Sequence, residues 1–124
     1  MDIHAFWDAV LRQDAEAIRA FFAKDAVIRW HCSNERFTVE EFIRANCEYP
    51  GVWTGQVERV CRTDEGLVTA VRVENAQDGV SFHVASFFCM KAARIVALDE
   101  YWGDDGPAPQ WRRQLGIGAP IRFS

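Results

Sequence analysis

The stretch Arg94–Trp102 carries the side chain with the clearest capacity for chemistry, the carboxylate of Glu100. Because strand side chains alternate between two faces, Glu100 shares a face with Leu98 and Trp102. It is therefore predicted to lie at the closed end of an apolar pocket. Loss of water there disfavours the charged form and brings the pKa toward the pH at which protons are exchanged. Glu100 is the predicted catalytic acid or base, and a one-residue slip would give that role to Asp99.

A simpler interpretation gives Glu100 a structural role. The carboxylate would then form an ion pair with Arg29, Arg72 or Arg112, or lie in water at the rim of the pocket. A paired carboxylate with a low pKa would favour a binding module, whereas an unpaired one facing an open cavity would favour an enzyme.

Two histidines could exchange protons with Glu100, because an unperturbed imidazole titrates near neutral pH. His31 follows Trp30 at a predicted strand end and could reach the pocket mouth, so it is the second predicted catalytic residue. His83 shares its strand face with Phe87, on the side away from the pocket. A subunit contact is the expected use of His83.

Ligand contacts are predicted from rings and from polar groups on inward faces. Asn46 and Tyr49 follow Phe42 at helical spacing, and a buried amide needs a partner, which could be a backbone group, a ligand carbonyl or Glu100 itself. The predicted ligand-binding residues are Trp30, Asn46, Tyr49, Trp53, Phe82, Val84, Ser86 and Trp102.

Several classes of function are disfavoured by composition. The net charge of -4 and the lack of a basic cluster predict no nucleic-acid or anionic-membrane partner. No apolar run is long enough to span a bilayer, so a cytoplasmic protein is expected. The four cysteines are widely spaced, and no metal site, phosphate loop or cofactor motif is expected.

The helices that must position these residues come early in the chain. Apolar spacing behind Asp2 and Asp14 predicts a helical hairpin over residues 2–23. Thr38 and Glu41 form a capping box that starts a third helix at Val39. That helix must end before Pro50.

Strands are predicted after Asp25 and then over residues 53–63, 67–75, 80–90 and 94–102. A turn through the loop Lys91–Ala93 sets Val84 opposite Glu100 and Phe82 opposite Trp102. Ile95 falls on the outer face. The tail from Gly103 is expected to be irregular.

At 124 residues the chain is expected to be one domain, residues 1–124. Helices followed by a meander of strands predict an α+β fold. Three N-terminal helices would pack on a curved, mainly antiparallel sheet that forms a cone-shaped pocket, where small ligands bind.

This order of elements, with Phe22–Trp30, the helix from Phe42 to Pro50 and the strand Arg94–Trp102, resembles the nuclear transport factor 2-like superfamily. More narrowly it is similar to the SnoaL-like branch, which includes polyketide cyclases and ketosteroid isomerases. The resemblance implies a cystatin-like α+β roll. It does not imply one reaction, because this scaffold hosts isomerases, cyclases, dehydratases and binding modules.

One family residue is absent. Ketosteroid isomerases carry a general-base Asp near the end of the first strand, where this chain has Trp30. The SnoaL-like cyclases are the better match, since they use an acid and a nearby His on late strands. In this chain those are Glu100 with His31 or His83.

These observations predict a small-molecule-binding protein for a hydrophobic ligand. As an enzyme it would be an isomerase, cyclase or dehydratase in which Glu100 moves a proton next to a carbonyl, without a metal or organic cofactor. The alternative is a non-catalytic ligand-binding or dimerisation module. A homodimer through the outer sheet face is expected, because Ala85, Phe87, Ile95, Ala97 and Tyr101 would expose a large apolar patch.

Overall fold

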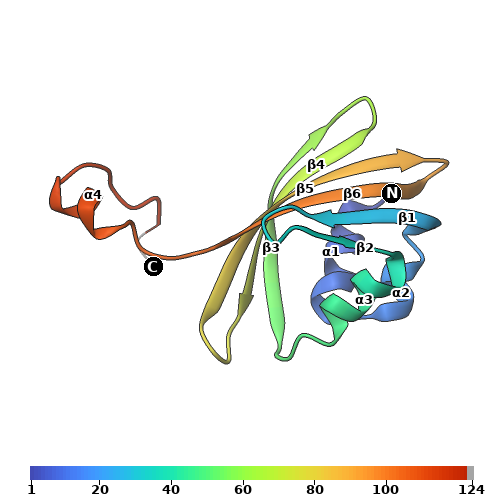
Figure 1. Cartoon of the computed structure of the whole chain (residues 1–124), viewed down its shortest axis with the longest axis horizontal. Helices are drawn as coiled ribbons and strands as arrows, with labels where there is room; N and C mark the ends of the chain where they lie inside the picture. Colours follow the sequence, from blue (N-terminus) through green and yellow to red (C-terminus); the bar gives the residue numbers. More distant parts are fainter. Residues whose placement is uncertain (123–124) are drawn as a thin grey trace.

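Helices cover one face of a strongly curved sheet (Figure 1) in the computed structural model, which describes residues 1–122. The helices before the long strands are α1 (Ile3–Arg12), α2 (Ala15–Arg19) and α3 (Val39–Cys47). The strands are β1 (Phe22–Trp30), β2 (Glu35–Phe37), β3 (Trp53–Arg62), β4 (Gly66–Asn75), β5 (Val80–Lys91) and β6 (Arg94–Asp104). This confirms the predicted α+β class, with three helices on a curved, mainly antiparallel sheet.

Side-chain caps start the helices where the sequence predicts them. Asp2 accepts a hydrogen bond from the backbone N–H of Ala5, and Asp14 accepts one from Ala17. At α3 both bonds of the capping box are present: Glu41 N–H donates to Thr38 Oγ1, and Thr38 N–H donates to the Glu41 carboxylate. These bonds satisfy amide groups that have no partner inside a helix.

The six strands are ordered β2-β1-β6-β5-β4-β3. Strands β1 and β6 are parallel, and all other neighbours are antiparallel. The β1–β6 pairing sets Trp30 beside Glu100 at the level of their Cα atoms. The first strand therefore brings an indole to the acid near the end of the last strand.

The β5–β6 register differs from the predicted one by two positions. Glu100 lies opposite Ser86, and Trp102 lies opposite Val84. The turn accounts for one position of this difference, because it holds only Ala92 and Ala93, both with positive φ. A bulge in the β6 segment that faces Cys89 and Met90 accounts for the second position.

The bulge also corrects the expected orientation of Ile95. Its side chain is fully buried, not on the outer face. An extra residue in one strand reverses the alternation on one side of the bulge. The sequence pattern alone did not reveal this insertion.

Two short elements were not predicted. The segment of Ser33–Arg36, expected to be a loop, includes the start of β2, which pairs with the end of β1. The tail contains a short helix, α4 (Gln110–Gln114), and extends away from the sheet (Figure 1). Residue Phe22, expected in the second helix, begins β1 instead. Short elements of this kind depend on tertiary contacts more than on local pattern.

Aromatic packing between α1 and the sheet forms the core. Phe6 is fully buried, and its ring contacts those of Trp7, Phe22 and Phe88 edge-to-face, at centroid distances of 5.5, 6.0 and 5.3 Å. The Trp7 indole N–H donates a buried hydrogen bond of 3.2 Å to Thr69. No helix of residues 1–122 is long and apolar enough to cross a membrane.

Candidate ligand pocket

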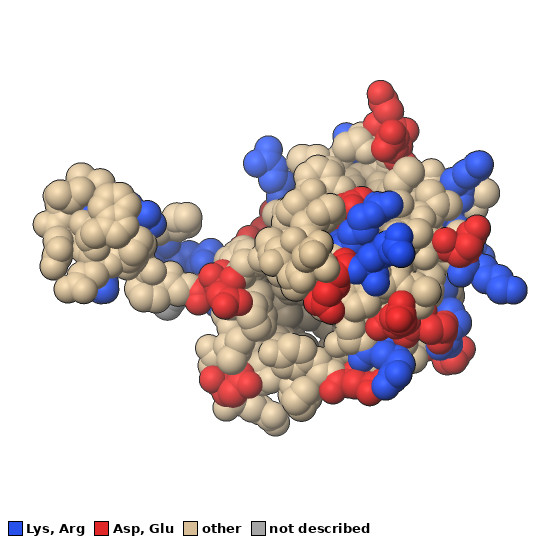
Figure 2. Space-filling view, in the orientation of Figure 1, with Lys and Arg blue, Asp and Glu red and all other residues tan. Residues whose placement is uncertain are grey.

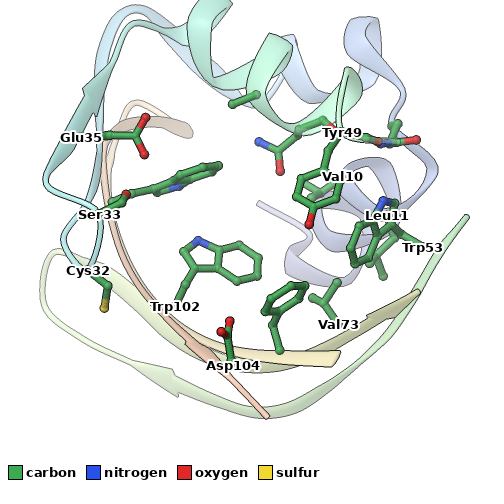
Figure 3. Close-up of a pocket in the computed structure, with 15 residues that line it drawn as sticks. Val10, Leu11, Cys32, Ser33, Glu35, Tyr49, Trp53, Val73, Trp102 and Asp104 are labelled. Carbon is green, nitrogen blue, oxygen red and sulfur yellow. The ribbon is translucent and has the colours of Figure 1, made fainter. Parts of the chain in front are cut away.

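A cavity of about 400 Å³ opens between the helices and the sheet. Its walls come from the ends of α1 and α3, the segment after β1, and strands β3 to β6 (Figure 3). The lining residues are Val10, Leu11, Gln13, Trp30, Cys32, Ser33, Glu35, Ala45, Asn46, Tyr49, Trp53, Val73, Phe82, Trp102 and Asp104. The volume is in the range of drug-sized ligand sites.

Five rings form a continuous arc along the cavity. Trp30 contacts Trp102 at a centroid distance of 6.0 Å, and Trp102 contacts Phe82 at 6.3 Å. Phe82 continues to Trp53 at 6.0 Å, and Trp53 to Tyr49 at 5.0 Å. Each ring is positioned by its neighbour, so the arc presents a preformed apolar surface.

Glu100 lies beneath this arc with only 1% of its surface exposed. Its carboxylate accepts a 2.9 Å hydrogen bond from the Trp30 indole and a 2.6 Å bond from the Ser86 hydroxyl. Burial raises the pKa of Glu100 to about 7, although the Ser86 and Trp30 bonds favour the charged form. The acid is therefore near its titration midpoint at neutral pH.

The indole N–H of Trp102 is buried and makes no hydrogen bond of normal geometry to the described residues. It nevertheless lies close enough to the carboxylate of Glu100 to help lower the pKa of that group. Two indole N–H groups and one hydroxyl thus surround a single carboxylate.

Among the described residues, Glu100 has no cationic partner. Arg29 pairs with Asp99 at 3.2 Å, and Arg72 pairs with Glu74 at 3.2 Å. The guanidinium of Arg112 lies over the Trp111 ring in the tail. None of the arginines that the sequence offered as partners neutralises the buried acid.

Glu100 is not itself in the cavity wall. Trp30 and Trp102 line the cavity, and both place their N–H groups toward the carboxylate. Direct contact between Glu100 and a ligand requires one of these rings to move. The acid was predicted at the closed end of an apolar pocket, and in the structure it lies behind the rings that form the wall.

Six of the eight predicted ligand-binding residues line the cavity: Trp30, Asn46, Tyr49, Trp53, Phe82 and Trp102. The other two are buried and do not line the cavity. Ser86 is fully buried and bonds to Glu100, and Val84 is buried opposite Trp102.

His31 lies away from the cavity. Its ring stacks on Tyr101 at 4.5 Å, and its Nε2 lies 2.7 Å from Asp99. Tyr101 and Asp99 belong to the opposite face of β6 from Glu100. The predicted pairing of His31 with Glu100 is therefore corrected to a pairing with Asp99.

His83 also lies on the outer face, as its strand phase predicts. It is paired with Asp105, and its Nε2 lies 3.1 Å from Glu58. The hydrogen bond with Asp105 raises the pKa of His83. This cluster joins the start of the tail to the sheet.

The amide of Asn46 donates a 2.8 Å bond to the backbone carbonyl of Phe42, which is the backbone role that the sequence left open. Gln13 bridges α1 to the end of α3 by donating to the carbonyls of Asn46 and Tyr49. The Tyr49 hydroxyl points into the cavity (Figure 3).

Sequence reasoning missed the polar residues at the cavity edge, chiefly Gln13, Glu35 and Asp104. Glu35 was assigned to a loop, and Asp104 to an irregular tail. Asp104 continues the alternation of Glu100 and Trp102, so extension of the strand phase by one pair would have found it. No group of three or more metal-ligating side chains occurs within residues 1–122.

Comparison with known proteins shows which solved structures share this architecture. No family model matches the sequence, and no curated protein matches it. The solved structures give clear matches. A candidate ketosteroid isomerase from Kribbella flavida superposes with a TM-score of 0.79, at 21% identity over 98% of this chain and 92% of the other.

The chain has the nuclear transport factor 2-like fold.

Two further structures with this fold agree. A nuclear transport factor 2-like protein of unknown function from Burkholderia xenovorans has a TM-score of 0.75, at 21% identity over 95% and 92% of the two chains. A candidate SnoaL-like polyketide cyclase from Jannaschia has a TM-score of 0.68, at 18% identity over 81% of each chain. At these identities the nuclear transport factor 2-like fold is shared, and the chemistry must be argued from the pocket.

Proposed function

We propose that this protein binds a small, mainly apolar molecule in the cavity beneath α1 and α3. The observation that carries the proposal is the arc of five rings, Tyr49 to Trp30, around a cavity of about 400 Å³. Apolar walls with a few polar groups are typical of small-molecule sites, in which the polar groups orient the ligand.

A second candidate is an enzyme of the isomerase, cyclase or dehydratase type. It is favoured by the Glu100 pKa of about 7, which suits a group that both takes and gives protons at neutral pH. Some solved neighbours are named as candidate enzymes of these classes. In this case the Trp102 ring would turn aside to let the carboxylate reach a carbon next to a ligand carbonyl.

Substitution of a pocket tryptophan tests binding. We expect Trp53→Leu to weaken binding of neutral mono- and bicyclic ketones by about tenfold, because a ring that stacks against the ligand is lost. The measurement is isothermal titration calorimetry. Trp111→Leu is the matched control, because Trp111 is exposed in the tail and does not line the cavity. Equal affinities of the two variants would remove the arc from ligand binding.

Substitution of the acid separates the two candidates. If the protein is an enzyme, the amide in Glu100→Gln can accept from Trp30 and donate to Ser86, so the fold and the affinity for a neutral ligand should be retained. An enzyme would lose turnover, because an amide cannot exchange a proton at working pH. Once a converted substrate is found, undiminished turnover in Glu100→Gln would exclude Glu100 from the mechanism. For a binding module the substitution changes affinity or stability only.

A further inference from the structure

All charged side chains that line the cavity are acidic. Within the described residues they are Glu35 and Asp104, and the lining contains no Lys, Arg or His. The two carboxylates come from separate strands, β2 and β6, and lie on different sides of the cavity (Figure 3). Red acidic side chains border the hollow in the space-filling view, and blue basic side chains lie beside some of them (Figure 2). The charge of the cavity lining itself is therefore negative.

Both acids are exposed, and their side chains make no contact that holds the fold together within residues 1–122. Neither Glu35 nor Asp104 forms an ion pair or a side-chain hydrogen bond within residues 1–122. Asp105, the neighbour of Asp104 in sequence, differs in this respect because it pairs with His83. Two carboxylates free of intramolecular partners are available to a ligand.

The walls between these acids are rings that attract cations. The π-face of an indole carries partial negative charge, and Trp is the best aromatic partner for a cation. Trp30, Trp53 and Trp102 all line the cavity, together with Tyr49 and Phe82. An aromatic enclosure with acidic groups at its edge is suited to a charged nitrogen that carries apolar substituents.

The buried acid strengthens this property of the wall. Trp30 donates its indole N–H to Glu100 at 2.9 Å. A hydrogen bond to a carboxylate polarises the donor and makes its ring more electron-rich. When Glu100 is ionised, its charge also lies directly behind the rings, where little water screens it.

We propose that the natural ligand of this pocket is a hydrophobic organic cation, such as a quaternary or protonated tertiary amine with an apolar body. This inference rests on the proposed function, the binding of a small apolar molecule in the same cavity. An anion of similar size is disfavoured, because Glu35 and Asp104 would repel it. In this assignment Glu100 is a positioning residue, which acts on the ligand through Trp30.

Three probes of similar shape and different charge test the proposal: phenyltrimethylammonium, its neutral carbon analogue tert-butylbenzene, and the anion 4-tert-butylbenzoate. Calorimetry and tryptophan fluorescence measure their dissociation constants for the full chain at low ionic strength. We expect the cation to bind at least about tenfold more tightly than the neutral probe, and the anion to bind most weakly.

Charge-neutralising variants locate the effect. Asp104→Asn and Glu35→Gln should each weaken binding of phenyltrimethylammonium by about three- to tenfold and leave tert-butylbenzene within about twofold. Glu65→Gln is the matched control, because it removes the same charge at the turn between β3 and β4, outside the cavity lining. Glu100→Gln should also weaken the cation selectively, which a purely structural role of Glu100 would not do.

The outcomes separate this inference from the proposed function. If the neutral probe binds as tightly as the cation, or the anion binds most tightly, the cation assignment is overturned and an apolar pocket remains. If Asp104→Asn and Glu35→Gln affect the cation no more than Glu65→Gln does, the acids at the mouth are not part of the site. If none of the three probes binds, the proposed pocket itself fails.

Discussion

The carboxylate of Glu100 is fully buried beside three hydrogen-bond donors, and no cationic group within residues 1–122 pairs with it. Removal of a carboxylate from water opposes its ionisation, and hydrogen bonds from Ser86 and Trp30 recover part of that cost. The balance leaves the pKa at about 7 instead of the ordinary 4.5. The folded protein therefore holds the Glu100 proton over a pH range in which the unfolded chain releases it.

This difference predicts a pH dependence of stability. Between pH 4.5 and pH 7 the folded state binds more protons than the unfolded state, so the free energy of unfolding falls as the pH rises through this window. The loss should total about 3 kcal/mol and level off above the folded pKa. Glu100→Gln should lack this slope in urea denaturation at a series of pH values.

The comparison with Glu100→Gln also removes other titrations. His83 has a raised pKa, and its contribution to stability is likewise lost as the pH rises through that folded value. That contribution is common to both proteins and cancels in their difference. Parallel stability curves for the two proteins would mean that Glu100 does not titrate abnormally.

Alternation along β6 was enough to predict that Glu100 and Trp102 share an inward face. Helical spacing was enough to predict that Asn46 faces the cavity. The depth of Glu100 was beyond the sequence, because it depends on rings from β1 and β6 that meet only in the folded sheet. Glu35 was missed for a related reason. Its strand has three residues and exists only by pairing with β1.

At the scale of the elements, the β5–β6 hairpin shows how two errors in a predicted register can still assign each side chain to the correct face of the sheet. The shorter turn and the bulge each move the register by one position, and together they move it by two. Because side chains alternate with a period of two, a shift of two keeps inward residues inward. The predicted inward face of Val84, Ser86 and Glu100 was therefore obtained from an incorrect register.

The hairpin turn itself is strained. Ala92 and Ala93 have φ values of 51° and 62°, a left-handed conformation that glycine adopts without the penalty of a Cβ atom. We expect Ala93→Gly to raise the free energy of unfolding by about 0.5–1 kcal/mol in chemical denaturation. Ala70→Gly, within β4, is the control and should lower it. Destabilisation by both substitutions would indicate that the turn has another conformation.

At the scale of the whole molecule, the outer sheet face carries exposed rings opposite the helices. Phe87 and Tyr101 are 47% and 44% exposed, and their centroids lie 5.8 Å apart. The patch is smaller than predicted, because Ile95 is buried in the core. Large exposed rings that contact each other are typical of a protein interface.

We expect a homodimer formed by this face. Phe87→Glu should convert it to a monomer in sedimentation velocity, because a charge would be buried in the contact. Val52→Glu is the control, since Val52 is 59% exposed and lies in the loop before β3. A wild-type protein that sediments as a monomer at micromolar concentration would contradict the expectation.

The parallel pairing of β1 with β6 also sets the order in which the molecule can fold during synthesis. Trp30 and Glu100 are 70 positions apart, and the intervening chain forms the whole β3–β5 meander. Contacts between distant segments form slowly, because a long loop must close before they are made. The inner edge of β1 stays unpaired until β6 leaves the ribosome. One strand then completes the sheet, the buried acid and the cavity wall together.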